Sequence, residues 1–170
     1  MSVPPFYPGT VFIAGSLTPN LYRFNPCNEK IELFQNITPI LYDVPGATVN
    51  GDLYGQIVCI NGLAYDAYAQ ELYFAFTWWN TLTGEVKSAL GKIDASKTMT
   101  YITQAGFPNR FAIFGNDIKM DSLGNLFATS EDGRLYHINI DPDDPNYGTI
   151  TTIFDKRGME YILTAGISLS

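Results

Sequence analysis

The chain has 170 residues, enough for one domain with a sizeable hydrophobic core. Hydrophobic residues make up 46% of it and aromatic residues 14%, which excludes a disordered chain and favours β-strands. The net charge of −7 excludes nucleic acid as an expected partner, because an acidic chain repels phosphate backbones. Charged residues are only 16% of the chain, so we expect a partner to cover part of the surface.

The sequence predicts no membrane insertion and no secretion. No apolar run reaches the 18 residues that a transmembrane helix needs. The first nine residues lack the basic and apolar regions of a signal peptide. We therefore expect a cytoplasmic protein or a component of an assembly made in the cytoplasm. Cys27 and Cys59 are predicted to be reduced thiols, with a disulfide between them as the alternative.

The first third of the chain predicts an arm, three strands and a long connection. Residues 1–9 are rich in Pro and Gly and are expected to form an extended arm, whereas residues 10–170 form a single domain. Alternating or apolar runs predict strands at 10–15, 21–24 and 30–34. The segment from 38 to 55 is predicted to be a loop, and loops of that size usually carry function or an interface.

Two further groups of strands follow. The second group is predicted at 60–65, 71–77, 86–94 and 98–103, with a loop over 78–85. The third group consists of three strands within 115–140, joined by turns at 123–125 and 131–133, and a fourth strand at 149–154. Four antiparallel strands within about 40 residues form one blade of a β-propeller. No helix longer than about two turns is expected.

A repeated phrase predicts that the blades are permuted. Residues 61–66, 116–121 and 165–170 occupy the same repeat position, that of the innermost strand of a blade. The last of these would complete the first group, which lacks such a strand. The predicted fold is therefore all-β, a β-propeller-like array of about three four-stranded blades, permuted and completed by oligomerisation. A monomeric β-sandwich or irregular barrel is the alternative.

An assembly strand follows from this arrangement. Three blades do not close into a ring, because propellers have four to eight. We expect the C-terminal strand to pair with the first strand of a neighbouring chain, or of its own, which would hide two sheet edges. The product would be a homo-oligomer, either a dimer or a longer array. The residues of this contact are Ala165, Gly166, Ile167, Ser168 and Leu169 on one side, and Val11, Phe12 and Ile13 on the other.

The phrases at 21–26, 60–66 and 116–125 resemble blade repeats of six-bladed propellers of the regucalcin/gluconolactonase type. They also resemble related propeller repeats of surface proteins. In the gluconolactonase-like enzymes, asparagines at the start of inner strands help hold a divalent metal, and Asn61 and Asn116 match those positions. The chain has no counterpart of the family's N-terminal glutamate ligand or catalytic aspartate. Calcium is therefore only an alternative cofactor, since it prefers several carboxylate ligands.

A ligand or partner face is predicted where the loops before the first and after the second strand of each blade meet. Adjacent tryptophans on one strand cannot both point inward, so one is expected in the core and the other at the surface or under a partner. An exposed tryptophan flanked by amides could stack on a sugar ring or anchor a protein interface. The predicted face consists of Asn61, Trp78, Trp79, Asn80, Asn116 and Asp117.

Other chemical motifs are weak. His137 is the only histidine and is expected to be structural, and the acidic run 141–146 lacks the EF-hand pattern. No nucleophile elbow and no metal-ligand spacing is found, so no catalytic residue, metal or cofactor is predicted. Two functions follow. The first is a non-enzymatic structural or binding module, not an enzyme, that self-assembles through its blades. The alternative is a metal-dependent lactonase-type hydrolase.

Overall fold

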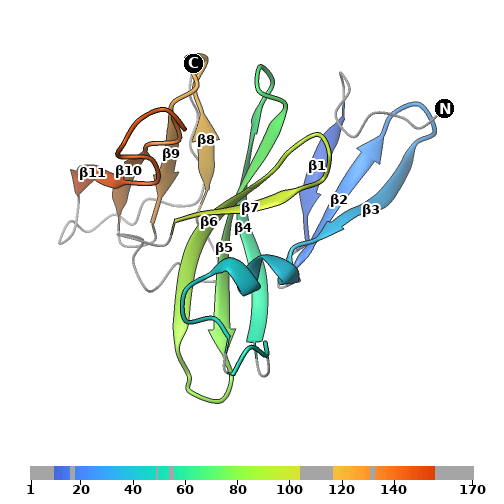
Figure 1. The fold of residues 1–170 in the computed structure, drawn as a ribbon. Coiled ribbons are helices and arrows are strands. Elements are labelled where there is room, and N and C mark those ends of the chain that lie inside the picture. The colour runs from blue at the N-terminus through green and yellow to red at the C-terminus, as the bar shows by residue number, and fades with distance from the viewer. Residues whose placement is uncertain are drawn as a thin grey trace.

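The computed structural model describes residues 10–15, 18–48, 50–53, 56–103, 117–130 and 133–155. Within these residues the chain forms three antiparallel sheets, each built from strands that follow one another in sequence. The second sheet lies between the first and the third (Figure 1). The predicted all-β class and the array of blade-like sheets are confirmed. The arm predicted over 1–9 and the strand predicted over 165–169 lie outside the described residues.

The first sheet has three strands in the order β1-β2-β3. They are β1 (Val11–Ala14), β2 (Asn20–Asn25) and β3 (Lys30–Asn36). All three match predicted strands. The β2–β3 turn is held by the Asn25 side chain, whose oxygen accepts a hydrogen bond from the backbone N–H of Cys27. Asparagine favours such turns because its side chain can bond the backbone two residues later.

The second sheet has the longest strands, in the order β4-β5-β6-β7. They are β4 (Gln56–Asp66), β5 (Glu71–Asn80), β6 (Val86–Ile93) and β7 (Met99–Thr103). The loop predicted over 78–85 is wrong in its first three residues, which belong to β5. The cause is that β4 begins at Gln56, four residues before the predicted start, so Val58 and Ile57 face Trp78 and Trp79 across the ladder.

The third sheet runs in the order β11-β10-β9-β8. Its strands are β8 (Ile118–Met120), β9 (Leu126–Thr129), β10 (Arg134–Ile138) and β11 (Ile150–Asp155), as predicted. The connections contain Gly124 and Gly133 with φ of +84° and +82°. Glycine suits these turns because it has no Cβ to clash in the left-handed region.

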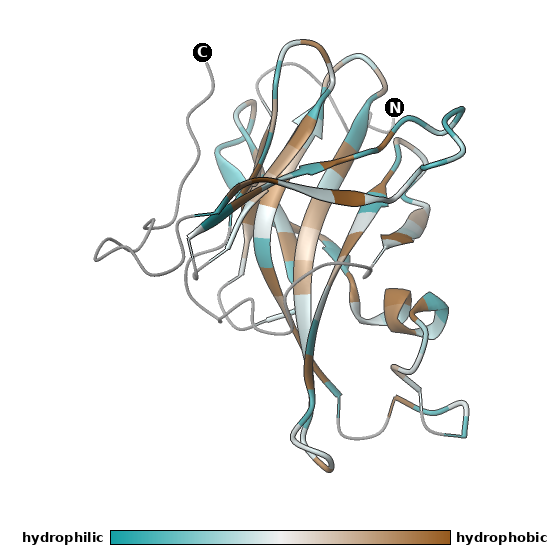
Figure 2. Cartoon of the chain, turned by 90° about the vertical axis from the view of Figure 1, so that its left-hand side faces the viewer, coloured by the Kyte–Doolittle hydropathy of each residue, from teal (hydrophilic) through white to brown (hydrophobic). Residues whose placement is uncertain are grey.

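The long connection after β3 contains a 3₁₀ helix, η1 (Thr38–Asp43), with a proline in its first turn. Its hydrophobic residues appear brown in Figure 2. Four apolar residues in and beside it are buried, and they form two pairs with the three-residue repeat of a 3₁₀ helix: Ile37 with Ile40, and Leu41 with Val44. This segment was predicted to be a functional loop, and in the structure its apolar face packs into the core.

Two hydrophobic clusters hold the sheets together, one on each side of the second sheet. The first joins the second sheet to the first sheet and η1, and it includes Leu21, Phe34, Leu72, Phe74, Phe76 and Trp78. The second joins the second sheet to the third, and it includes Tyr73, Ala75, Ile118, Leu126, Tyr136 and Ile138. Successive residues of β5 thus alternate between the two clusters, because side chains alternate across a strand.

Close packing on the first-sheet side requires a glycine in β6. A Cβ added to Gly91 would lie 2.5 Å from Cδ1 of Ile40 and 2.7 Å from the ring of Phe74. The β6–β7 turn also reaches the first sheet, since the Lys97 ammonium lies 4.8 Å from the centre of the Phe34 ring. Helix η1 and the first sheet are therefore fitted closely to this side of the second sheet.

Both cysteines are free thiols, so the disulfide alternative is wrong. Cys27 is exposed in the β2–β3 turn, whereas Cys59 is buried in β4. Burial raises the pKa of the Cys59 thiol. Among the described residues, no helix has both the length and the apolar character needed to cross a membrane.

Candidate functional site

Asn61, a residue of the predicted ligand or partner face, lies in the middle of β4 at an irregularity of the β4–β5 ladder. Its amide nitrogen donates to Oγ1 of Thr77 at 2.6 Å, and Thr77 lies 3.0 Å from the Ser88 hydroxyl oxygen. Thr77 and Ser88 are buried. The three side chains form a polar chain across β4, β5 and β6, so Asn61 has a structural contact whatever else it binds.

The two tryptophans of the predicted face point to opposite sides of β5, as strand alternation predicts. Trp78 is buried in the first cluster, against Phe76. Trp79 is 44% exposed. Asn80 is buried, and its side-chain oxygen accepts hydrogen bonds from the backbone N–H groups of Leu82 and Thr83. Trp79 is therefore the tryptophan that can meet a ligand or partner.

Asp117 directly precedes β8, and its backbone carbonyl accepts a hydrogen bond from the backbone N–H of Thr129. Asn116 lies outside the described residues. Asn61 lies in β4, and Asp117 directly precedes β8. These two strands contact each other where the second sheet meets the third. That the residues of the predicted face act together as one site stays a prediction.

The predicted assembly strand is described on its N-terminal side only. In β1, Phe12 points toward the core, where its ring centre lies 5.1 Å from that of Phe34. Val11 and Ile13 point to the opposite face and are exposed. Ala165, Gly166, Ile167, Ser168 and Leu169 lie outside the described residues, so their pairing with β1 stays a prediction.

The side of the first sheet turned away from the second sheet is hydrophobic; we call it the outer face. The ladder aligns its residues in two cross-strand rows, which are Val11–Phe24–Ile31 and Ile13–Tyr22–Leu33. Ile31 is 64% exposed and Leu33 59%. Residues aligned in this way form one continuous surface. A sheet face of six aligned apolar or aromatic side chains is unusual where water is the only neighbour.

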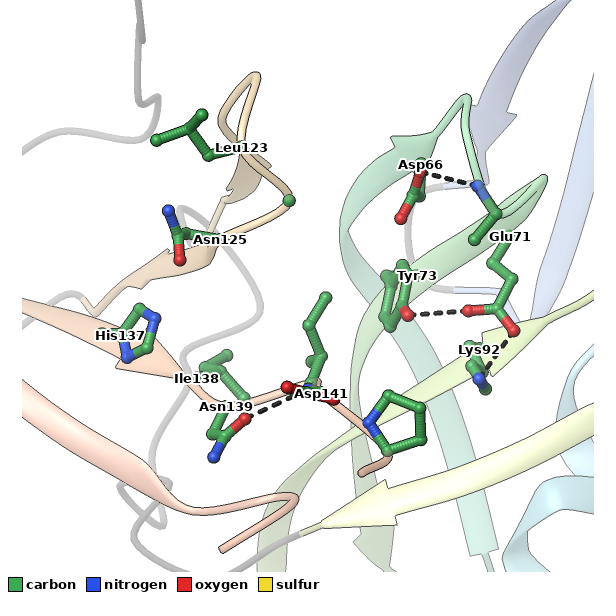
Figure 3. A pocket seen from close by; sticks show the side chains of 14 residues that line it. Asp66, Glu71, Tyr73, Lys92, Leu123, Asn125, His137, Ile138, Asn139 and Asp141 are labelled. Atoms are coloured by element: carbon green, nitrogen blue, oxygen red, sulfur yellow. Dashed lines mark hydrogen bonds and ion pairs between the residues drawn. The ribbon is translucent and has the colours of Figure 1, made fainter. Parts of the chain in front are cut away.

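A cavity of about 460 Å³ lies between the second and third sheets, at the end of the sheets where β4 turns into β5. Figure 3 shows Glu71, Tyr73 and Lys92 on the wall formed by the second sheet. Opposite them are residues of the third sheet and its connections, among them Asn125 and Asn139. Because this size is typical of ligand pockets, the cavity is a candidate site.

An ion pair lies in the cavity wall. The Lys92 ammonium is 2.6 Å from one Glu71 carboxylate oxygen, and both side chains are 19% exposed. The Tyr73 hydroxyl donates to the other oxygen at 2.7 Å. Burial raises the pKa of Tyr73 far above its usual value, and the hydrogen bond to Glu71 and nearby negative charges add to this. Burial also raises the pKa of Tyr147, whose ring is close enough to feel both Lys92 and Glu71.

A second cavity of about 480 Å³ adjoins the first and shares Asp66, Leu123 and Gly124 with it. Its lining includes two tyrosines, Tyr65 and Tyr68. Of the predicted ligand or partner face, the residues that the structure describes, which are Asn61, Trp78, Trp79, Asn80 and Asp117, line neither cavity. Sequence reasoning missed the residues that line the cavities. The i, i+2 spacing of Glu71 and Tyr73 was visible, but the position of Lys92 opposite Tyr73 depends on the β5–β6 register.

No group of three or more metal-binding side chains occurs in the part of the chain that the structure describes. Neither a protein-family model nor a curated protein sequence matches the chain. The resemblance to regucalcin- and gluconolactonase-type propellers therefore stays a prediction, and function has to be argued from the surfaces themselves.

Proposed function

We propose that this chain is a non-enzymatic structural or binding module that self-assembles by adding a second copy to the end of its array of sheets. The outer face of the first sheet carries the proposal. Its two aligned rows contain four exposed aliphatic residues, Val11, Ile13, Ile31 and Leu33. Covering such a face removes apolar surface from water, and this favours binding of a partner.

The packing inside the chain supports a second copy as that partner. Each side of the second sheet is covered by a neighbouring sheet through an apolar cluster. The outer face has the same apolar character but lies at the end of the array. At the opposite end, β11 carries the exposed residues Ile153 and Phe154. A head-to-tail contact would bring these two ends together, and such heterologous contacts produce rings or open arrays.

The number of strands also favours assembly through the first sheet. This sheet has three strands among the described residues, whereas the second and third sheets have four. A strand from residues 165–169 of a neighbouring copy, added beside β1, would give all three sheets the same number. Added strands contribute main-chain hydrogen bonds as well as side-chain contacts.

The experiment measures the mass of the native particle by light scattering during size-exclusion chromatography. We expect the unmodified chain to form a dimer or a larger particle. Ile31→Lys with Leu33→Lys should reduce the particle to single chains, because a covered charge without a partner is strongly unfavourable. The control is Leu82→Lys, which changes an equally exposed residue in the β5–β6 turn and should leave the mass unchanged.

Circular dichroism of each variant checks that the sheets are retained. A single-chain mass for the unmodified protein would overturn the proposal, and so would a particle that the double lysine variant does not change. Deleting residues 163–170 tests the added strand separately. We expect that deletion to reduce assembly and stability, and a truncated chain with unchanged mass would reject the strand while leaving the outer face in place.

The lactonase-type alternative has no specific observation in its favour. Asn61 donates its amide N–H to Thr77, and Asn116 lies outside the described residues. A calcium titration separates the two functions, because a metal that binds only the folded state raises the melting temperature. We expect no rise for the assembly module.

A further inference from the structure

We propose that the cavity between the second and third sheets, together with the adjoining cavity that carries Tyr68, binds a neutral carbohydrate of more than one sugar ring. The two cavities adjoin each other and share Asp66, Leu123 and Gly124 in their linings, so a ligand of more than one ring can contact both; we call the pair the groove. One part of this groove is polar and the other is aromatic. This site is distinct from the outer face of the first sheet and does not depend on assembly.

The wall formed by the second sheet offers donors and acceptors side by side. Lys92 has three N–H donors, of which the ion pair with Glu71 uses one. The Glu71 carboxylate accepts from Lys92 and from the Tyr73 hydroxyl, and it has further lone pairs. The hydroxyls of a sugar each donate and accept, so adjacent hydroxyls match this alternation. Hydrogen bonds to charged groups are also stronger than those between neutral groups.

The opposite wall adds amides and apolar surface. Asn125 uses its amide nitrogen on Asp121, at 2.8 Å, which leaves its oxygen as an acceptor. Asn139 holds the start of the 141–146 loop by accepting from the backbone N–H of Asp141, and so this amide is fixed in position (Figure 3). Ile138, Ile140 and Pro142 add apolar surface, and His137 and Asp141 also line this wall. Apolar side chains beside fixed amides suit the C–H face and the hydroxyl edge of a sugar ring.

The second cavity supplies an aromatic platform. Tyr68 stands fully exposed in the β4–β5 turn, whereas the Tyr65 ring lies beside Phe12 on the side of the first sheet, with ring centres 6.3 Å apart. Tyrosine buries a large, rigid surface at low cost in conformational entropy, and its hydroxyl can bond while the ring stacks. A sugar ring beside the polar cavity would therefore reach Tyr68, which is why the ligand is expected to have more than one ring.

The charges disfavour an anionic ligand, because the carboxylates of Asp66, Glu71, Asp121 and Asp141 outnumber the one ammonium, that of Lys92, in the two linings. The carboxylate of Glu71 is neutralised by Lys92. Asp66 accepts backbone hydrogen bonds from Tyr68 and Ala69 within its own turn. Asp121 likewise accepts from Leu123 and Asn125. Asp141, which also lines the polar cavity, accepts from the backbone N–H of Asp143 at 3.0 Å. These aspartates hold the turns that shape the cavities, and the wall formed by the second sheet carries the Glu71–Lys92 pair.

The test begins with the full-length chain on an array of neutral gluco-, galacto-, manno- and N-acetylglucosamine oligosaccharides. The strongest glycan is then titrated by calorimetry. The paired variant Glu71→Gln with Lys92→Met removes both charges together, so that neither is left buried alone. We expect it to weaken binding by at least about tenfold, because charge-assisted hydrogen bonds are lost. Its melting curve and circular dichroism verify that it is folded.

A second variant avoids the buried wall. Tyr68→Ala removes an exposed ring and should weaken binding by about three- to tenfold through loss of stacking. Tyr42→Ala is the matched control, because Tyr42 is an exposed tyrosine on η1 that lines neither cavity. It should bind like the unmodified chain.

Three results would overturn the proposal. The first is no binding by the full-length chain to any glycan on the array at millimolar concentration. The second is binding that neither the paired variant nor Tyr68→Ala weakens. The third is tighter binding of a polyamine, spermidine, than of any glycan, which would show that the groove selects cations. Failure of the assembly experiment would leave these outcomes unchanged.

Discussion

The two sides of the second sheet differ, although both are buried. On the side toward the first sheet, β5 presents Leu72, Phe74, Phe76 and Trp78, and η1 adds a further apolar layer. On the side toward the third sheet, the same strand presents Glu71, Tyr73, Ala75 and Thr77, and a cavity remains beside it. One side joins the sheets by apolar packing, whereas the other places hydrogen-bonded polar side chains beside a cavity. A single strand can thus form a closely packed core on one face and a polar cavity wall on the other.

The largest effect on stability is expected when a buried ring is removed from the side of the second sheet that packs against the first sheet. Phe74→Ala removes a fully buried ring that packs against Phe76, with ring centres 5.7 Å apart. We expect the free energy of unfolding to fall by about 3–5 kcal/mol, because transfer and cavity terms add. Urea titration measures this. A loss below about 1 kcal/mol would mean that this side is less closely packed than the contacts indicate.

The opposite change adds volume to the side of the second sheet that packs against the first sheet. Gly91→Ala places a methyl group against Ile40 and Phe74. Overpacking of this kind typically lowers the free energy of unfolding by about 1–3 kcal/mol. Thermal unfolding monitored by near-ultraviolet circular dichroism would show it. An unchanged melting temperature would indicate that η1 moves away from β6 without loss.

A smaller effect is expected on the polar side. Tyr73→Phe removes the hydroxyl that donates to Glu71, and a net loss of about 1 kcal/mol is typical of one hydrogen bond. The pH dependence is a sharper measurement. Because the pKa of Tyr73 is raised in the folded state, its contribution is complete below the unfolded value of 10.0 and is lost as the pH rises above it.

The variant should therefore lose less stability than the unmodified chain between pH 10 and pH 11, when urea midpoints are compared across that range. Tyr65→Phe is a suitable comparison, because burial raises the pKa of Tyr65 as well, although its side chain is more exposed. If the Tyr73 variant and the unmodified chain lost the same stability between pH 10 and pH 11, the raised pKa of Tyr73 would not be the cause of the loss.

The smallest effect on stability is expected on the outer face of the first sheet, which takes part in neither contact between sheets. Ile31→Ser alters the outer face of the first sheet, where the side chain is 64% exposed. In dilute solution, where single chains dominate, we expect a change within about 0.5 kcal/mol, as is usual for surface positions. A large loss would show that the outer face is already covered within one chain.

Much of the fold was predictable because it is local. Each sheet is formed by consecutive strands, so alternation and turn residues were sufficient to locate most of them. The signal of η1 was also present, since Ile37, Ile40, Leu41 and Val44 have helical spacing, but the surrounding Pro and Gly obscured it. The pairing of Glu71 with Lys92 was not predictable. The two residues are 21 positions apart in the sequence, and the register between β5 and β6 decides whether they meet.

The different surroundings of the two thiols provide a chemical handle on a single sheet. Maleimides react with the thiolate, and a raised pKa together with burial keeps Cys59 in the unreactive thiol form. Cys27 is exposed in the β2–β3 turn, at the edge of the sheet that bears the outer face. The natural sequence can therefore take one dye per chain at that turn, and energy transfer between labelled copies would report the spacing of first sheets without any engineered residue.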